Sequence, residues 1–200
     1  LFLVDIDREN LAIVADDIEK QTSSIVQRAV VDLSVPKEVD KFLDKNNNFD
    51  VVINNAGTTR SNHLFDYKDS DWDLTYKVNL FAPYKIIQKV SQTMSQEKKL
   101  GSIINVTSLG AELGFPDNPA YVAFKGALKQ LTKAAAIDLS TNGVRVNSVG
   151  PGYTKTNMTI KSWNDKKLKL DRTNRTILGR WGEPKDLIGV VIFLASDASS

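Results

Sequence analysis

The sequence predicts an open α/β fold, in which parallel strands form a sheet and helices cover it. Short apolar runs such as Val51-Val52-Ile53 alternate along the chain with longer helical stretches. Uninterrupted apolar strands are buried on both faces, as in parallel sheets. Repeated strand–helix units join such strands through right-handed crossovers. No internal repeat or linker interrupts the chain, so we expect residues 1–200 to form one domain.

Each strand is predicted by a short apolar run that ends in polar or small residues. The first run, Leu1-Phe2-Leu3-Val4, ends at Asp5. The others alternate with helical stretches at regular intervals, as in strand–helix repeats. The expected strands are residues 1–4, 26–31, 50–53, 102–106 and 144–149.

The stretches between these strands predict helices. Ser34 and Pro36 favour the start of one helix, and Glu183-Pro184 favour the start of the last. The expected helices are residues 8–20, a helix from residue 36 onward, and residues 70–98, 119–142 and 185–195. The regular alternation of the two element types supports the parallel sheet.

The composition excludes several classes of protein. A hydrophobic content of 42% with 25% charged residues is typical of a globular chain. A net charge of +2 gives no indication of nucleic-acid binding. Without cysteine and with His63 as the single histidine, the chain offers little material for a metal site. No apolar run approaches the length that crosses a bilayer, and we expect a cytoplasmic protein without a membrane partner.

Polar and small residues follow the expected strands, where a parallel sheet binds its ligands. Asn and Gly are common in turns and Asp caps helices, so each position alone carries little weight. Their agreement at successive strand ends predicts a binding site at one edge of the sheet. The residues concerned are Asp5, Asp32-Leu33, Asn54-Asn55-Ala56-Gly57, Thr107-Ser108 and Pro151-Gly152-Tyr153-Thr154.

Tyr121 and Lys125 lie four residues apart on an expected helix and therefore share a face. A tyrosine hydroxyl titrates near pH ~10. We expect the Lys125 cation to stabilise the phenolate and to lower the pKa of Tyr121 towards neutral pH. Ser108, from a strand end, would fix the oxygen that gains or loses the proton.

These residues occur in an order that resembles the short-chain dehydrogenase/reductase family. The resemblance extends from end to end of the chain and implies a Rossmann-like, doubly wound parallel sheet flanked by helices. It rests on Asn54-Asn55-Ala56-Gly57, Asn79, Ser108, Tyr121-x-x-x-Lys125, Pro151-Gly152 and Gly179-Arg180-Trp181-Gly182-Glu183-Pro184.

The resemblance implies an enzyme that transfers a hydride between a nicotinamide and a secondary alcohol or ketone. Tyr121 would be the general acid and base, and Lys125 would lower its pKa and bind the nicotinamide ribose. Ser108 would hydrogen-bond the substrate oxygen, and Asn79 would hold a water that relays protons to Lys125. The implied cofactor-binding residues are Asp5, Asp32, Leu33, Asn55, Ala56, Gly57, Tyr121, Lys125, Pro151, Gly152, Thr154 and Thr156.

The chain departs from the family pattern in two respects. The glycine-rich turn that seats the pyrophosphate, its strand and the usual last strand are absent, so we expect a fragment of a longer chain. A sheet without its central strand would expose unpaired backbone on both flanks of the gap. In addition, Phe124 stands where the family has a small residue, and we expect it to narrow the space behind Tyr121 and Lys125.

Asp5 favours NAD as the cofactor, with NADP as the alternative. A carboxylate at this position accepts hydrogen bonds from the ribose hydroxyls and repels the additional phosphate of NADP. Arg8 is able to pair with that phosphate, but Asp7 offsets its charge.

The segment between Asn157 and Leu178 is basic, and the family places it over the site. A solvated helical surface is the ordinary explanation of such charge. The sharper hypothesis is that Arg172 or Arg175 binds a substrate carboxylate. The motifs after Pro151 resemble those of sugar-acid dehydrogenases, including gluconate 5-dehydrogenases and 2-deoxygluconate 3-dehydrogenases, which implies a small-molecule sugar acid as substrate.

Two other functions stay open. The run from Asn54 to Arg60 also resembles the reductases of 3-oxoacyl chains on acyl carrier protein, and a basic segment suits an acidic carrier. A non-catalytic dinucleotide-binding scaffold is the second alternative, since folds host many functions. Whichever function holds, the family resemblance implies a homotetramer, or else a homodimer, formed through the helices around 75–98 and 120–141.

Overall fold

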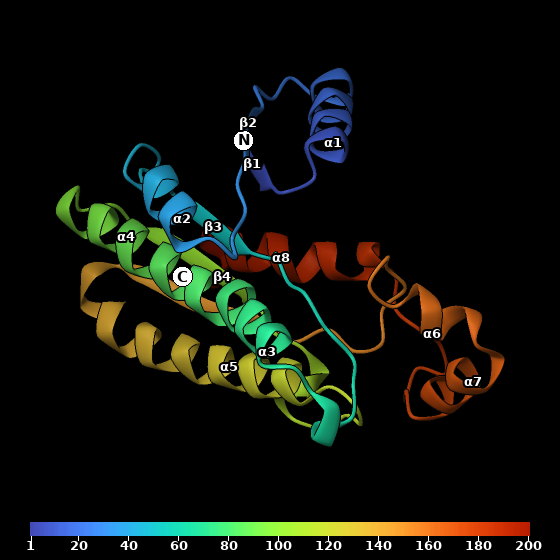
Figure 1. Ribbon diagram of the computed structural model, residues 1–200. Coiled ribbons are helices and arrows are strands. Elements are labelled where there is room, and N and C mark those ends of the chain that lie inside the picture. The colour runs from blue at the N-terminus through green and yellow to red at the C-terminus, as the bar shows by residue number, and fades with distance from the viewer.

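Five parallel strands form two separate sheets in the computed structural model, which describes residues 1–200 (Figure 1). The first sheet pairs β1 with β2, and the second has the order β3-β4-β5. This architecture confirms the predicted Rossmann-like α/β class. The strands are β1 (Phe2–Asp5), β2 (Gln27–Val30), β3 (Val51–Asn54), β4 (Gly101–Val106) and β5 (Val144–Val149).

Helices cover both faces of the three-stranded sheet. On β4, Ile103 belongs to the core beneath α4, while the hydroxyl of the adjacent Ser102 donates to the carbonyl of Leu194 in α8 at 2.7 Å. Because successive strand residues point to opposite faces, α4 and α8 lie on opposite sides of the sheet. The helices are α1 (Arg8–Gln21), α2 (Pro36–Leu43), α3 (Asp69–Tyr76), α4 (Ala82–Gln96), α5 (Pro119–Leu139), α6 (Ile160–Asn164), α7 (Lys166–Asn174) and α8 (Ile188–Ala195).

The core lies between the three-stranded sheet and α2, α4 and α5. Gly101 begins β4 directly under Met94, and the flexible end of the methionine fills the space that a side chain at residue 101 would occupy. The strand and α4 thus pack closely at this point. None of the helices combines the length and the apolar character needed to cross a bilayer. The buried members of this core are Val39, Leu43, Ala82, Ile87, Val90, Met94, Ile103, Ala135, Val144 and Val146.

The helical stretch expected over residues 70–98 contains a π-helical turn, Lys77–Phe81, between α3 and α4. Pro83 has no N–H and cannot donate to the carbonyl of Asn79 four residues earlier. The turn widens at this point, and the N–H of Ala82 donates to the carbonyl of Lys77. Single π turns of this kind are frequent at functional sites.

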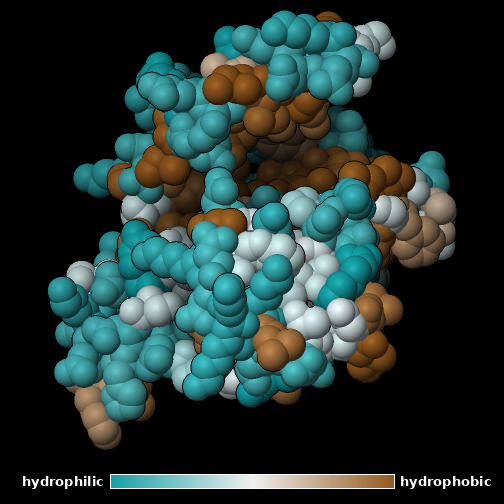
Figure 2. Space-filling view, turned by 90° about the vertical axis from the view of Figure 1, so that its right-hand side faces the viewer, coloured by the Kyte–Doolittle hydropathy of each residue, from teal (hydrophilic) through white to brown (hydrophobic).

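A hollow lined by apolar side chains separates the two-stranded sheet from the rest of the molecule (Figure 2). β1 is hydrogen-bonded only to β2, and β3 only to β4. The expectation that every strand is buried on both faces is therefore wrong for β2 and β3, where Val30 and Ile53 are 42% and 46% exposed. The contact of Phe2 with Phe42, at 5.6 Å between ring centres, joins the small sheet to α2.

Candidate active site

An open cavity of about 780 Å³ lies at the carboxyl ends of the strands. It is bounded by residues from β1 and from the ends of β3, β4 and β5, together with the first two turns of α5. Residues at the ends of β1, β3, β4 and β5 thus surround one cavity. The predicted site residues that line it are Asp5, Asn55, Ala56, Gly57, Ser108, Tyr121, Lys125, Pro151, Gly152, Thr154 and Thr156.

Three of the implied catalytic and cofactor-binding residues do not line this cavity. The carboxylate of Asp32 accepts the backbone N–H of Ser34 at 2.8 Å and so shapes the turn before α2. Leu33 packs against the hydrophobic core. Asn79 is fully buried in the π turn. Asp32 therefore shapes a turn and Leu33 contributes to the core packing. Their predicted contact with an adenine ring stays a prediction.

The apolar wall that α8 contributes to the cavity was not predicted from the sequence. Ile188, Val191 and Ile192 line it, at a spacing of three and four residues that puts them on one helix face. That spacing was available from the sequence. The helix is apolar all round, however, so the pattern did not single out the cavity face. Asn157, Met158 and Thr159 also line the cavity, just before α6.

Ser108 is fixed by the backbone at the end of β4. The N–H of Thr107 donates to the carbonyl of Val149 at 2.8 Å, and the N–H of Leu109 donates to the carbonyl of Pro151 at 2.9 Å. The Ser108 hydroxyl accepts the N–H of Gly110 at 3.0 Å, which caps a short 3₁₀ helix. The residue thus has hydrogen-bonded backbone on both sides.

Tyr121 and Lys125 lie on adjacent turns of α5, and both line the cavity. Burial raises the pKa of Tyr121, and the nearby Ser108 side chain lowers it in part. Lys125 is only 3% exposed, and burial lowers its pKa to about 8. Its ammonium donates to the carbonyl of Val106 at 2.6 Å and lies 6.0 Å from the centre of the Tyr121 ring.

The expected lowering of the Tyr121 pKa by Lys125 is therefore wrong for this structure. The lysine cation is held at the end of β4, and the hydroxyl of Tyr121 is kept protonated by its burial. Phe124 also differs from expectation, because its ring packs against Trp72 of α3 with 4.9 Å between ring centres. It fills the space between two helices.

Asn79 holds the loop that follows β3. Its side-chain oxygen accepts the N–H of Thr58 and its amide donates to the carbonyl of the same residue, both at 2.8 Å. A β-carbon at Gly57 would lie 3.5 Å from the oxygen of Asn79 and 3.6 Å from the ammonium of Lys125. The side-chain oxygen of Asn79 and the ammonium of Lys125 thus both lie next to Gly57, on the side where a side chain would project.

The same loop is tied to the start of α5. The side-chain oxygen of Asn118 accepts the hydroxyls of Thr59 at 2.9 Å and Ser61 at 3.0 Å. Its amide donates to the carbonyl of Pro116 at 2.8 Å. Asn118 precedes the first residue of α5 and lies three residues before Tyr121. These contacts, which the sequence did not reveal, fix the loop relative to the helix that carries Tyr121.

A buried chain of hydrogen bonds links the sheet to α5. The amide of Asn54 donates to the side-chain oxygen of Asn105 at 2.8 Å, and the amide of Asn105 donates to the hydroxyl of Thr132 at 2.9 Å. Thr132 in turn donates to the carbonyl of Leu128 at 2.8 Å. Asn54, at the end of β3, thus supports the sheet.

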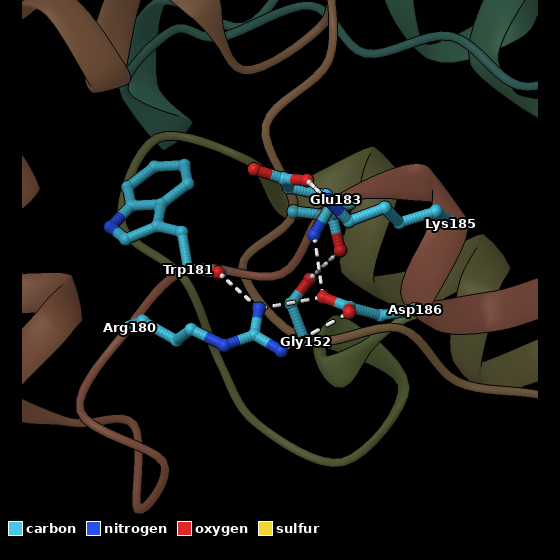
Figure 3. Close-up of polar contacts among 7 residues, drawn as sticks. Gly152, Arg180, Trp181, Glu183, Lys185 and Asp186 are labelled. Carbon is cyan, nitrogen blue, oxygen red and sulfur yellow. Dashed lines mark hydrogen bonds and ion pairs between the residues drawn. The ribbon is translucent and has the colours of Figure 1, made fainter.

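The segment that carries α6 and α7 begins and ends at neighbouring positions, Thr154 and Gly182. Thr154 forms a parallel β-bridge with Gly182. Figure 3 shows the guanidinium of Arg180 facing the carboxylate of Asp186, with hydrogen bonds of 2.7 and 3.1 Å. Asp186 also accepts the N–H of Glu183 at 2.8 Å, and these two partners lower its pKa to about 2. The base of the segment is therefore closed by backbone and side-chain bonds.

A family model described as enoyl-(acyl carrier protein) reductase matches residues 1–200. The chain belongs to the short-chain dehydrogenase/reductase family. The match covers the whole chain, in agreement with the resemblance seen in the sequence.

Two curated relatives of this short-chain dehydrogenase/reductase differ in substrate. It is 37% identical to 5-keto-D-gluconate 5-reductase of Escherichia coli K12 over 75% of the chain and 59% of the relative. It is 36% identical to 3-oxoacyl-[acyl-carrier-protein] reductase of Thermotoga maritima over 96% of the chain and 83% of the relative. The chain thus spans less than two thirds of the first relative and most of the second.

The short-chain dehydrogenase/reductase chain also matches solved structures of the family. One of them is a gluconate 5-dehydrogenase from Burkholderia cenocepacia J2315 in complex with NADP and tartrate. The superposition has a TM-score of 0.90 at 32% identity and covers 99% of this chain and 78% of the other. The arrangement of strands and helices is therefore shared along nearly the whole chain.

Proposed function

We propose that this chain carries the proton-transfer site of an NAD(P)-dependent oxidoreductase that interconverts a secondary alcohol and a ketone. The observation that carries the proposal is the cavity in which Ser108, Tyr121 and Lys125 meet at the carboxyl ends of the strands. A partly buried phenol with a raised pKa, beside a serine hydroxyl, is suited to proton transfer to a carbonyl oxygen. The nicotinamide, when bound, supplies or accepts the hydride.

In the reducing direction, Tyr121 donates its proton to the substrate oxygen, which Ser108 holds by a hydrogen bond. The burial that raises the pKa of Tyr121 keeps this proton in place until the substrate arrives. Lys125, which would also bind the nicotinamide ribose, is the source of the proton that returns to Tyr121. A pKa of about 8 makes the ammonium of Lys125 a better proton donor than an ordinary lysine at neutral pH. In the oxidising direction each proton moves the opposite way.

Asn79 supplies the outer end of this proton path. Its backbone carbonyl lacks the α-helical donor that Pro83 cannot provide, and we assign a water to this carbonyl. Gly57 leaves room between Asn79 and Lys125. A water held there passes protons to the Lys125 ammonium.

The residues around the cavity suit a dinucleotide. We assign the adenosine ribose to Asp5 and the nicotinamide end to Gly152, Thr154 and Thr156, all of which line the cavity. Asp5 at the end of β1 is exposed, which leaves its carboxylate available to ribose hydroxyls. A carboxylate at this position favours NAD over NADP.

The substrate that we propose is a sugar acid, oxidised or reduced at a secondary position. One curated relative acts on 5-keto-D-gluconate, as its name states, and the gluconate 5-dehydrogenase structure contains tartrate. Both molecules carry carboxylates and several hydroxyls. The basic segment that carries α6 and α7 adds positive charge beside the cavity.

A 3-oxoacyl thioester on acyl carrier protein is the second candidate substrate. It is favoured by the relative from Thermotoga maritima, which matches 96% of the chain. The reaction class and the roles of Tyr121, Lys125 and Ser108 are the same for both substrates. A preference for NADPH and activity on carrier-linked substrates would distinguish this candidate.

We further propose that the protein assembles through α3, α4 and α5 as a homotetramer or a homodimer. Trp72 and Tyr76 pack against Phe124 across the two helices and stay 43% and 37% exposed. Tyr84 on α4 is 41% exposed. Aromatic residues that stay half-exposed on one surface are typical of protein interfaces. Light scattering of the purified protein tests the assembly.

The function is tested by following the absorbance of reduced nicotinamide with NAD or NADP and a panel of sugar acids. Turnover of a sugar acid that falls by about 10²–10⁴-fold in Tyr121→Phe supports the proposal. Activity confined to an oxoacyl thioester with NADPH assigns the second substrate. Cofactor binding without turnover of either class would indicate a dinucleotide-binding scaffold.

A further inference from the structure

Two lysines share the ring of Trp163, a residue of α6. The ammonium of Lys169, on α7, lies 3.7 Å from the centre of this ring, and that of Lys155 lies 4.7 Å from it. An aromatic face attracts a cation but leaves its N–H groups able to donate to an anion. Neither lysine forms an ion pair with an acidic residue.

A third cation, Arg172, joins the same group one turn along α7. Its guanidinium lies 5.2 Å from the centre of the Tyr153 ring and 5.8 Å from that of Trp181. Trp181 is 5% exposed and donates its indole N–H to the carbonyl of Lys169 at 3.3 Å, which holds α7 in place. The Arg172 side chain donates no hydrogen bond to any protein group, so its N–H groups are free.

The acidic residues of the segment are engaged elsewhere. Asp165 caps α7 by accepting the N–H of Leu168 at 2.9 Å. Asp171 pairs with Arg175 at 3.1 Å on the exposed side of the helix. Three cations therefore gather around neighbouring aromatic rings without a counter-charge, an arrangement that repels itself and that an anion would stabilise.

The three cations do not themselves line the cavity, but a series of contacts connects them to Ser108. Along the strand after β5, Gly152 and Thr154 line the cavity, whereas Tyr153 between them turns to Phe115, with 6.2 Å between ring centres. The Phe115 ring in turn lies against Gly110, where an added β-carbon would approach it to 3.1 Å. Gly110 is the residue that donates to the Ser108 hydroxyl.

We propose that Lys155, Lys169 and Arg172 form an anion-binding platform that takes the carboxylate of the substrate, an inference that rests on the proposed oxidoreductase function. The reacting carbon lies at Ser108 and Tyr121, and the chain of the substrate extends past Phe115 and Tyr153. Its carboxylate meets the free N–H groups of Arg172, with the two lysines adding charge. The alternative anion is a phosphate of the dinucleotide.

The test compares Arg172→Gln with the matched variant Arg175→Gln. Arg175 directly follows the same helix but pairs with Asp171. For each protein, kcat/KM is measured with gluconate and with its uncharged carboxamide. We expect Arg172→Gln to lower the value for gluconate by about tenfold or more and to leave that for the carboxamide nearly unchanged. Arg175→Gln should change neither, and Arg172→Lys should restore part of the loss.

An equal loss on both substrates, or the same loss in Arg175→Gln, would overturn the platform. A rise in KM for the dinucleotide alone would also overturn it, by assigning the cations to a phosphate. Binding of gluconate is followed separately by the fluorescence of Trp163 and Trp181. Gluconate that changes the fluorescence of the wild type but not of Arg172→Gln supports the platform even without turnover. If the wild type turns over gluconate but the fluorescence change is the same in Arg172→Gln, the platform is wrong and the proposed function stands.

Discussion

The buried ammonium of Lys125 donates a 2.6 Å hydrogen bond to the backbone carbonyl of Val106, the last residue of β4. This bond joins the helix that carries Tyr121 to the strand that precedes Ser108. The pKa of Tyr121 is raised by burial, and the Ser108 side chain opposes this rise in part. The depressed pKa of Lys125 then makes the stability of the fold depend on pH.

We expect the free energy of unfolding to rise between pH 8 and pH 10.5 because of Lys125. Burial lowers its pKa from 10.5 to about 8, so in this interval the unfolded chain holds a proton that the folded chain has released. The full rise is on the order of 3 kcal/mol. Lys125→Met should lack it, as measured by urea unfolding at several pH values.

Lys133→Met is the control, because Lys133 is exposed on the same helix. It should keep the rise of the wild type. Above pH 10 the raised pKa of Tyr121 acts in the opposite direction, since the folded chain then holds the proton longer. Equal pH dependence of the Lys125→Met variant and the wild type would contradict the assigned pKa.

Asn118→Ala should loosen the loop that ends at Ser61 and thereby lower both stability and activity. The side-chain oxygen of Asn118 accepts two hydroxyls, from Thr59 and Ser61, and each such bond is worth about 1 kcal/mol. We expect a loss of about 1–3 kcal/mol in unfolding free energy. In kinetics we expect a lower kcat, because Tyr121 lies one helical turn away.

The conservative variant Asn118→Asp separates this positioning role from general damage. It keeps the acceptor for both hydroxyls and should restore most of the stability and of kcat. If Asn118→Asp is as impaired as Asn118→Ala, the important contact is the hydrogen bond from the Asn118 amide to the carbonyl of Pro116, and not the link to the loop.

Thr132→Val tests the buried chain of hydrogen bonds. The valine has nearly the same shape but leaves the amide of Asn105 without its acceptor inside the core. An unpaired buried donor costs about 1–3 kcal/mol, and we expect that loss in thermal or urea unfolding. Thr93→Val, which removes only a bond to the helix carbonyl of Lys89, should cost less. Equal losses would mean that the chain through Asn105 adds nothing.

The sequence predicted the strand ends and the Tyr121–Lys125 pair because each depends on local spacing. Apolar runs mark the strands, and parallel strands bring their carboxyl ends together. The π turn at Asn79 could have been inferred from Pro83, since a proline within a helical stretch removes a specific hydrogen bond. It was missed because the stretch as a whole predicts a continuous helix.

Other features depend on contacts between distant residues and were not predictable. The gap between the two sheets was expected only through the family resemblance, from the absent central strand, because hydropathy does not specify which strands pair. Asp5 and Asp32 both lie at strand ends and both accept the N–H two residues further on, yet only Asp5 lines the cavity. The stacking of Arg172 on Tyr153 joins residues on two segments, and no local pattern distinguishes Arg172 from Arg175.

Asp5→Asn should shift the cofactor preference from NAD towards NADP. Asp5 lines the cavity at the end of β1, and one of its oxygens accepts the N–H of Asp7 at 2.9 Å. Asparagine keeps an oxygen for this bond, so the turn should survive while the negative charge is lost. Without that charge the additional phosphate of NADP is no longer repelled. We expect the ratio of kcat/KM for NADP to that for NAD to rise about tenfold or more.

Asp17→Asn is the control, because Asp17 is an exposed acid on α1 that does not line the cavity. This variant should leave the ratio unchanged. An unchanged ratio in Asp5→Asn would mean that Asp5 does not face the ribose, and the choice of cofactor would then have to depend on another residue of the β1–α1 turn, with Arg8 the first to test.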